Sequence, residues 1–341
     1  MPRANSNLLV QSLRGTSQVF FMENALTGVL FFAAMAYASS VTGNWATTIG
    51  AAIGVLVATL TARLLECDDP SVSSGLYGFN GVLVGAALPT FIAVSPQLWA
   101  SIVIGAAAST VFTAAFSATL TGKWGIPGST GPFVLTGWLM VAAAYSFGGL
   151  HVTGDAPKLA GDVAGLTGIP ALTDLVAIFF RNIAQVYLLG SAVSGVIILA
   201  GILIASVPAG VAAAAGSLIS MIVAIAMGAD PKAVSQGLYG FSPVLTAMAV
   251  GVVFLTPSPR VAVYAGLATV MTVFVQGALD VMVAPAGIPS FTAPYVLTMY
   301  LFIAPKKLMA PHPHGPVADP MIDDQGKAPG KVSVHAAGTA R

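Results

Sequence analysis

Charged side chains are scarce in this sequence: they make up 7% of its 341 residues, against 56% that are hydrophobic. A water-soluble globular protein carries roughly 25% charged residues. A chain this long and this poor in charge cannot cover a water-facing surface, so we expect an integral membrane protein. The formal net charge of +1 leaves no basic excess with which to bind nucleic acid.

Cysteine is equally rare, because Cys67 is the only one in the chain. A single cysteine excludes an intrachain disulfide and any CxxC metal or redox motif. The four histidines, His151, His312, His314 and His335, all lie outside the long apolar stretches. No pairing of Ser, Cys or Glu with His falls within those stretches. We therefore predict no catalytic residue, no metal site and no cofactor.

Apolar stretches of spanning length, by contrast, are abundant. About 20 apolar residues suffice for a helix to cross a bilayer. A polar connector separates two sets of five such stretches, and a Pro- and Gly-rich charged segment, which we expect to be a disordered tail, follows the last. The expected spans are 17–41, 45–64, 76–95, 98–121 and 130–149, then 182–206, 209–228, 238–256, 260–284 and 291–306.

Three sequence blocks recur in the same order and at nearly constant spacing, which indicates an internal duplication. The third pair is identical at eight of twelve positions. The pairs are RGTSQVFFMENALTG (14–28) with RNIAQVYLLGSAVSG (181–195), GLYGFNGVL (75–83) with GLYGFSPVL (237–245), and GIPGSTGPFVLT (125–136) with GIPSFTAPYVLT (287–298).

An odd number of spans in each half makes the halves face opposite ways. We therefore expect an all-α polytopic membrane protein with two inverted halves, 1–150 and 181–307, a connector at 151–180 and a tail at 308–341. An inverted repeat places a pathway at the interface of the halves, near the midplane. Ten spans put both termini on one side, and basic residues near both ends indicate the cytoplasmic side of the cell (inner) membrane.

Each GLYGF block follows a polar loop that an ordinary span does not need. Asp-Pro in each loop is a helix-start signal, and Gly78 and Gly240 allow close backbone approach. We expect each block to form a half-helix that enters the membrane without crossing it, because irregular backbone persists there only where it is buried or lines a watery path. An ordinary packed helix with small residues at its interface is the alternative.

Taken together, these blocks resemble the urea transporter family. The specific motifs are RGxxQV from Arg14, GLYGFN followed by VL, and PxxTxPFxxxxW from Pro127 to Trp138, and the resemblance extends to Lys306. It implies five spans and a re-entrant half-helix in each half, with a pore along the pseudo-two-fold axis. It also implies a homotrimer in which every protomer conducts urea passively and selectively through its own pore.

The resemblance further implies which residues line the pore. In this family urea slides edge-on between aromatic rings, its N–H groups follow rows of oxygens, and the central constriction holds a threonine from each half. The matching positions are Gln18, Val19, Phe21, Phe79, Leu83 and Thr130 in the first half, and Gln185, Val186, Leu188, Phe241, Leu245 and Thr292 in the second.

Two departures from the family pattern lie in the second half. Leu188 stands where the first half has Phe21, and Ser242-Pro243 replaces Asn80-Gly81. We therefore expect the second aromatic slot to be looser than the first, or to use Tyr187.

The residues themselves fit such a solute. Gln18 and Phe21 at i,i+3, and Phe79 and Leu83 at i,i+4, should each share a helix face. One amide beside one ring suits a flat molecule with polar edges, which must replace the water that it loses. Thr130 and its repeat partner each follow an Ile-Pro break, where regular helix is interrupted, and should meet near the axis.

Other transport functions fit less well. An ammonium channel would need histidines in its pore, an aquaporin-type channel would need paired Asn-Pro-Ala motifs, and a coupled transporter would need charges repeated in both halves. The two acids within the spans, Glu23 and Asp280, do not repeat, and we expect Glu23 to lie at a helix end or a subunit interface. A channel for a short amide, ammonia, water or glycerol stays open.

Overall fold

The computed structural model describes residues 7–154, 171–305 and 311, and these residues form helices and no strand. The predicted tail at 308–341, apart from Pro311, lies outside the described residues, as does the middle of the predicted connector. The basic residues near the ends other than Arg14 lie outside them as well.

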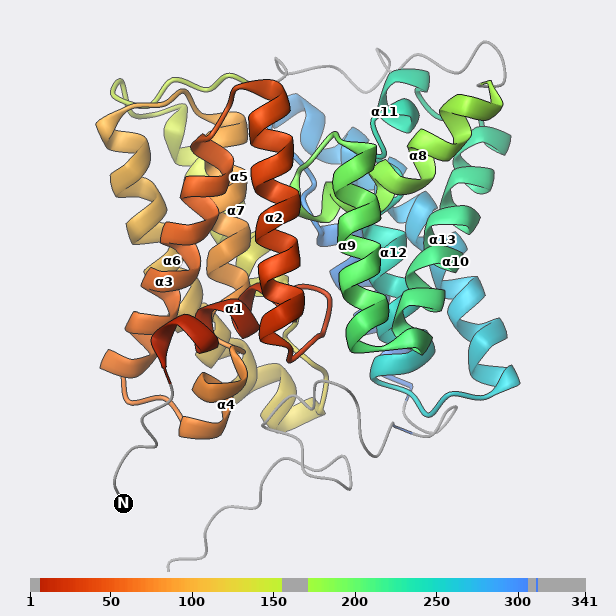
Figure 1. The fold of residues 1–341 in the computed structure, drawn as a ribbon, viewed down its shortest axis with the longest axis horizontal. Helices are drawn as coiled ribbons and strands as arrows, with labels where there is room; N and C mark the ends of the chain where they lie inside the picture. Colours follow the sequence, from red (N-terminus) through yellow and green to blue (C-terminus); the bar gives the residue numbers. More distant parts are fainter. Residues whose placement is uncertain (1–6, 155–170, 306–310, 312–341) are drawn as a thin grey trace, which may run out of the picture.

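Two successive sets of helices follow the same order (Figure 1). The first set is Leu8–Gln18 (α1), Ala25–Thr42 (α2), Ala46–Leu64 (α3), Asp69–Ser74 (α4), Phe79–Phe91 (α5), Pro96–Phe116 (α6) with a π-helical end at Ser117–Trp124 (η1), and Gly131–Ala144 (α7). The second is Leu172–Ala184 (α8) with a 3-10 turn at Gln185–Tyr187 (η3), Ala192–Ala205 (α9), Val207–Ala226 (α10), Pro231–Ser235 (α11), Phe241–Met248 (α12) with a π-helical end at Ala249–Val253 (η4), Pro259–Val283 (α13) with a 3-10 end at Ala284–Ala286 (η5), and Ala293–Ile303 (α14).

Matched helices begin with the same capping chemistry. Asp68 and Asp230 cap α4 and α11, each through a side-chain oxygen that accepts a backbone N–H, and both helices carry Pro in their first turn. Ser95 and Ser258 do the same for α6 and α13. The Asp-Pro helix starts predicted from the sequence are therefore confirmed.

The first predicted span, 17–41, begins too early: the chain turns sharply inside it, and the helix that is long enough to cross a membrane is Ala25–Thr42. Helix α1 ends at Gln18, Phe21 has a left-handed backbone with φ of 63°, and α2 begins only at Ala25. The second half repeats the break at Leu188, with φ of 60°, and the segments on either side are bent by 73°. The prediction that Gln18 and Phe21 share a helix face is therefore wrong.

Spanning length is reached by fewer helices than expected. Five of the described helices, α2, α3, α6 with η1, α10, and α13 with η5, are long and apolar enough to cross a membrane, or six if the bent α8–α9 pair counts as one span. Helices α5, α7, α12 with η4, and α14 are apolar but shorter. At 1.5 Å per residue the 14 residues of α7 reach only about 21 Å, against a hydrocarbon core of about 30 Å.

Helices α3 and α5 approach each other at the level of their backbones. A methyl group on Gly85 would lie 1.9 Å from the carbonyl oxygen of Gly50, and one on Gly54 would lie 2.1 Å from that of Gly81. Each helix thus presents a Gly-x3-Gly pair to the other, the small-residue contact typical of membrane helices. This contact fixes α5, whose first residue is Phe79.

The two halves meet along α2 and α9, which lie side by side in Figure 1. The hydroxyl of Thr27 donates to the Gly201 carbonyl at 3.0 Å, and that of Ser194 donates to the Ala34 carbonyl at 2.8 Å. The two bonds are reciprocal, and their order along the helices makes α2 and α9 antiparallel. In the same view α1 and α4 lie toward one end of the molecule and α8 and α11 toward the opposite end.

Candidate functional site

The Arg and Gln of the RGxxQV motif both bind the end of the short helix α4. A guanidinium nitrogen of Arg14 donates to the Ser73 carbonyl at 3.0 Å, and the amide nitrogen of Gln18 donates to the Ser74 carbonyl at 2.9 Å. These carbonyls have no acceptor role inside the helix, so they need outside donors. The motif therefore joins α1 to the loop that leads into the GLYGF block.

The second half repeats this arrangement. A guanidinium nitrogen of Arg181 donates to the Ser235 carbonyl at 2.9 Å, and the amide nitrogen of Gln185 donates to the Gln236 carbonyl, also at 2.9 Å. The recurrence of Arg and Gln in both sequence blocks thus has a structural cause. Glu23, which does not recur, lies outside the helices, 3.6 Å from the Arg14 guanidinium.

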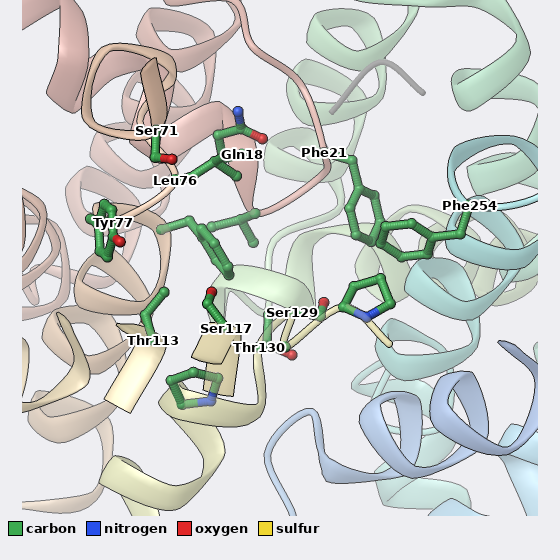
Figure 2. Close-up of a pocket in the computed structure, with 15 residues that line it drawn as sticks. Gln18, Phe21, Ser71, Leu76, Tyr77, Thr113, Ser117, Ser129, Thr130 and Phe254 are labelled. Atoms are coloured by element: carbon green, nitrogen blue, oxygen red, sulfur yellow. The ribbon is translucent and has the colours of Figure 1, made fainter. Parts of the chain in front are cut away.

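A cavity of about 60 Å³ lies between α1, the first GLYGF block (75–79), α6 and the segment before α7 (Figure 2). A single water molecule needs roughly 10–15 Å³ of such volume, so a small solute fits. None of the described residues that line the cavity carries a charge. They are Gln18, Val19, Phe21, Ser71, Leu76, Tyr77, Phe79, Thr113, Ser117, Pro127, Gly128, Ser129, Thr130, Pro132 and Phe254.

The cavity wall combines ring faces with hydrogen-bonding atoms. The rings of Phe21 and Phe254 pack edge to face with centroids 5.8 Å apart, and Figure 2 shows them together on one side of the cavity. Gln18 is 3% exposed, and its amide oxygen has no hydrogen-bond partner. A buried acceptor without a partner costs free energy, which a solute N–H group would recover.

Asn80 fixes the irregular segment that forms the floor of the cavity. Its amide nitrogen donates to the Thr113 hydroxyl at 3.0 Å and to the Ser129 carbonyl at 3.3 Å. Its amide oxygen accepts the N–H of Phe133 at 3.1 Å. One fully buried side chain thus joins α5, α6, the segment before α7 and the start of α7, and so positions Thr130.

At Thr130 the cavity meets the second half of the molecule. The hydroxyls of Thr130 and Thr292 are hydrogen-bonded at 2.8 Å, and both side chains are buried. Each threonine immediately precedes a short apolar helix, α7 or α14, as expected from the Ile-Pro breaks in the sequence. The hydroxyl of Ser129 is bonded to that of Tyr295 at 2.6 Å, which adds a second contact between the halves beside the threonine pair.

The structure brings five of the six first-half candidates to this cavity, namely Gln18, Val19, Phe21, Phe79 and Thr130. The sixth, Leu83, is fully buried in α5 and is not part of the lining. The second-half candidates do not line this cavity either; Val186, Phe241, Leu245 and Thr292 are buried, while Gln185 and Leu188 are half-buried.

Tyr187, one of the two alternatives that the sequence left open for the second slot, lies in the core instead. It is fully buried, its hydroxyl donates to the Thr16 carbonyl, and its ring packs against Phe20 and Phe31 with centroids 5.9 and 5.6 Å away. The left-handed turn at Leu188 directs the chain away after this residue. Tyr187 is therefore part of the core between the halves.

Sequence reasoning missed several residues of the cavity. Leu76 and Tyr77 belong to the repeated GLYGF block, so their recurrence as Leu238 and Tyr239 was an available signal. Ser117 and Phe254 had none, because each sits at the edge of a π-helical segment, η1 or η4, that no sequence pattern announces. Such segments often occur at functional sites.

Comparison with known proteins identifies the family of this chain. The family model described as Urea transporter matches residues 9–307. Urea transporter 1 from Ovis aries is 28% identical over 301 residues, which cover 85% of this chain and 75% of the relative. Urea transporter 1 from Rattus norvegicus is 29% identical over 298 residues, with the same coverage. The chain is a multi-pass membrane protein that belongs to the urea transporter family.

Proposed function

We propose that this chain is a passive, urea-selective channel whose pore enters through the neutral cavity and crosses the molecule at the Thr130–Thr292 pair. Membership of the family makes the chain a membrane transport protein for urea rather than an enzyme. The observation that carries the pore proposal is the junction itself: an uncharged cavity of solute size ends at two hydroxyls, one from each half.

The halves, we propose, are inverted repeats related by a pseudo-two-fold axis through the threonine pair. A two-fold relation produces reciprocal contacts: if a residue of the first half contacts a residue of the second, then the counterparts of these two residues contact each other as well. The antiparallel bonds between α2 and α9 have this form. The repeat counterparts Trp138 and Tyr300 make similar bonds across the interface, each 2.9 Å long: the Trp138 indole donates to the Pro289 carbonyl and the Tyr300 hydroxyl donates to the Gly128 carbonyl. The two acceptors differ by one position, because the counterpart of Pro289 is Pro127.

The cavity chemistry explains how urea would lose its water without meeting a high barrier. Phe21, Phe79 and Phe254 would cover the flat faces of the molecule, while the unpartnered oxygen of Gln18 would accept an N–H group. At the constriction between the halves, Thr130 and Thr292 share one hydrogen bond, which leaves one hydroxyl hydrogen and further lone pairs for the solute. An ion would find no compensating charge there.

We call the cavity described above the first mouth of the pore. By the repeat relation, the second half would supply an equivalent second mouth, lined by Gln185, Val186, Leu188 and Phe241. Leu83 and Leu245 would lie beside the constriction at the Thr130–Thr292 pair. We further propose that the protein is a homotrimer in the cell (inner) membrane, with one pore in each protomer and both termini in the cytoplasm. The trimer rests on the family resemblance, and the orientation rests on the basic residues near the ends of the chain.

Stopped-flow light scattering of proteoliposomes tests the proposed function. Under inward gradients, urea should enter faster than glycerol, acetamide or ammonium, linearly with the gradient at low concentration. Collapse of proton and sodium gradients should leave the rate unchanged, because none of the described residues around the cavity carries a charge that could couple transport to an ion. Loss of uptake on addition of an uncoupler would overturn the passive reading, and faster entry of another solute would reassign the substrate.

A further inference from the structure

A polar cluster in the second half combines an amide and a carboxylate, which the first half lacks at the matching positions. The amide nitrogen of Gln276 donates to both carboxylate oxygens of Asp280, at 2.9 and 3.0 Å, and to the Ser290 hydroxyl at 2.8 Å. Gln276 and Asp280 lie one turn apart on α13, and Ser290 lies in the segment before α14. Neither α13 nor this segment contributes a side chain to the cavity already described.

The repeat relates this cluster to the wall of the first cavity. Counted from the N-cap serine that begins α6 or α13, Gln276 occupies the position of Thr113, and Asp280 that of Ser117. Ser290 occupies the position of Gly128 in the Gly-Ile-Pro block. All three first-half counterparts line the cavity. By the repeat relation, the cluster therefore corresponds to this part of the cavity lining and would line the second mouth.

Tyr239, the counterpart of the cavity residue Tyr77, supports the same placement. A methyl group on Gly277 would lie 3.9 Å from the Tyr239 ring and 4.0 Å from its hydroxyl, so the ring rests on α13 beside the cluster. Ring, carboxylate and amide thus gather at one place, as ring and hydroxyls do in the first cavity.

The cluster has unused hydrogen-bonding capacity. Gln276 is 2% exposed, and its amide oxygen has no hydrogen-bond partner. Its nitrogen supplies the bonds to the Asp280 carboxylate, and a carboxylate with two oxygens has room for several more donors. A buried acceptor beside a half-buried acid fits a ligand that carries positive charge and several N–H groups.

We propose that Asp280 and Gln276 form a binding site, at the mouth built by the second half, for a small planar cation with N–H donors, of which guanidinium is the simplest. Guanidinium has the flat shape of urea with a third N–H₂ group in place of the oxygen. It would bind where a carboxylate faces the path and would stop at the uncharged threonine pair, so it would block urea entry. The first mouth, with Ser117 in this position, would not hold it. The inference rests on the proposed urea pore.

The test uses the full chain in proteoliposomes and in detergent. Guanidinium chloride, far below denaturing concentrations, should inhibit urea flux, whereas sodium chloride and tetramethylammonium chloride at equal ionic strength should not. Asp280→Asn should weaken the inhibition, measured against the variant's own uninhibited flux, by at least about tenfold, because a charge-assisted contact is lost. Asp174→Asn, which removes an exposed acid at the start of α8, should leave the inhibition unchanged.

Two further measurements make the outcome decisive. Ser117→Asp should create a second inhibitory site at the first mouth and so strengthen inhibition. Thermal melting in detergent should show stabilisation of the wild type by guanidinium and none of Asp280→Asn, a readout that does not depend on urea flux. Equal inhibition of wild type and Asp280→Asn, or inhibition by all cations alike, would overturn the site. A wild type that carries no urea yet is stabilised by guanidinium would overturn the pore alone.

Discussion

At the scale of single residues, the clearest contrast between the halves is Asn80 against Ser242. The two occupy the same position, directly after the Phe that begins α5 or α12, and both are fully buried. The Asn80 amide joins its own helix to three other segments, namely α6, the segment before α7 and the start of α7, whereas the Ser242 hydroxyl has no hydrogen-bond partner. A buried polar group stabilises only when it is paired.

Matched alanine substitutions should therefore have opposite consequences. Asn80→Ala leaves the Phe133 N–H without its acceptor and should lower the free energy of unfolding by about 2–3 kcal/mol. Ser242→Ala removes an unpartnered hydroxyl and should be neutral or stabilise by up to about 1 kcal/mol. Thermal melting in detergent measures both. Equal losses of stability would show that Ser242 has a partner that pairs its hydroxyl in the membrane.

A second residue-scale prediction concerns the ring of Phe79. This side chain is 8% exposed and lines the cavity from the first turn of α5. Phe79→Ala would widen the cavity and remove a face that excludes water, so discrimination between urea and glycerol should fall while the fold is kept. The ratio of the two fluxes in proteoliposomes measures this.

The control for Phe79 is Phe147→Ala, because Phe147 is 59% exposed and is not one of the residues that line the cavity. It should keep the selectivity of the wild type. Phe241→Ala should resemble Phe79→Ala if the second mouth has the proposed lining. Full selectivity in both Phe79→Ala and Phe241→Ala would mean that these rings only pack.

At the scale of helices, the α3–α5 contact determines where Phe79 and Asn80 lie. Gly85→Ala would place a methyl group 1.9 Å from the Gly50 carbonyl, so the helices must separate. We expect a loss of stability of about 1–3 kcal/mol, the usual cost of adding a methyl group to a tightly packed contact, and reduced urea flux because α5 shifts. Thermal melting and flux report the two effects.

Gly266→Ala on α13 is the matched control, because a methyl group there meets nothing within 4 Å. It should be neutral, or slightly stabilising as alanine favours helix over glycine by about 0.5–1 kcal/mol. Similar melting temperatures for the two variants would contradict the close packing of α3 on α5.

The sequence predicts those helices and breaks that leave a hydrophobic pattern or a turn motif, and it does not predict the others. The long apolar helices and the capped starts at Asp68 and Asp230 came directly from composition and turn chemistry. The duplication was inferred from three repeated sequence blocks. The break at Phe21 could not, since a left-handed phenylalanine inside an apolar run carries no sequence signal. The same holds for the π-helical segments beside Ser117 and Phe254.

The candidate site was predictable to the extent that it repeats. Thr130 and Thr292 were expected to meet because each follows the same Gly-Ile-Pro block, and the structure places their hydroxyls 2.8 Å apart. The amide of Gln18 was expected to face the solute, but its nitrogen binds α4 and only its oxygen is free. Side-chain partners of this kind depend on loop geometry that the sequence alone does not specify.

At the scale of the whole molecule, the reciprocal bonds between the halves make the interface a stable frame around the proposed pore. Thr27 and Ser194 bind across α2 and α9, and aromatic side chains of α7 and α14 bind the backbone of the opposite half. Rocking of one half against the other would break these bonds, so we expect the halves to stay fixed during transport. A fixed frame fits passive conduction, and we expect urea flux to show no saturation at low concentrations.

The central claim is that urea crosses between the halves at Thr130 and Thr292, and the Thr130→Val/Thr292→Val double variant tests it most directly. Valine keeps the shape of threonine and removes the hydroxyl, so the constriction would have no side-chain hydrogen-bonding group for urea that has lost its water. Urea flux through proteoliposomes should fall more than about tenfold, which corresponds to at least about 1.4 kcal/mol of barrier. Each single variant should lose less, because one hydroxyl remains. Normal urea flux in a double variant that melts like the wild type would contradict the account, because the hydroxyl pair would then only hold the halves together.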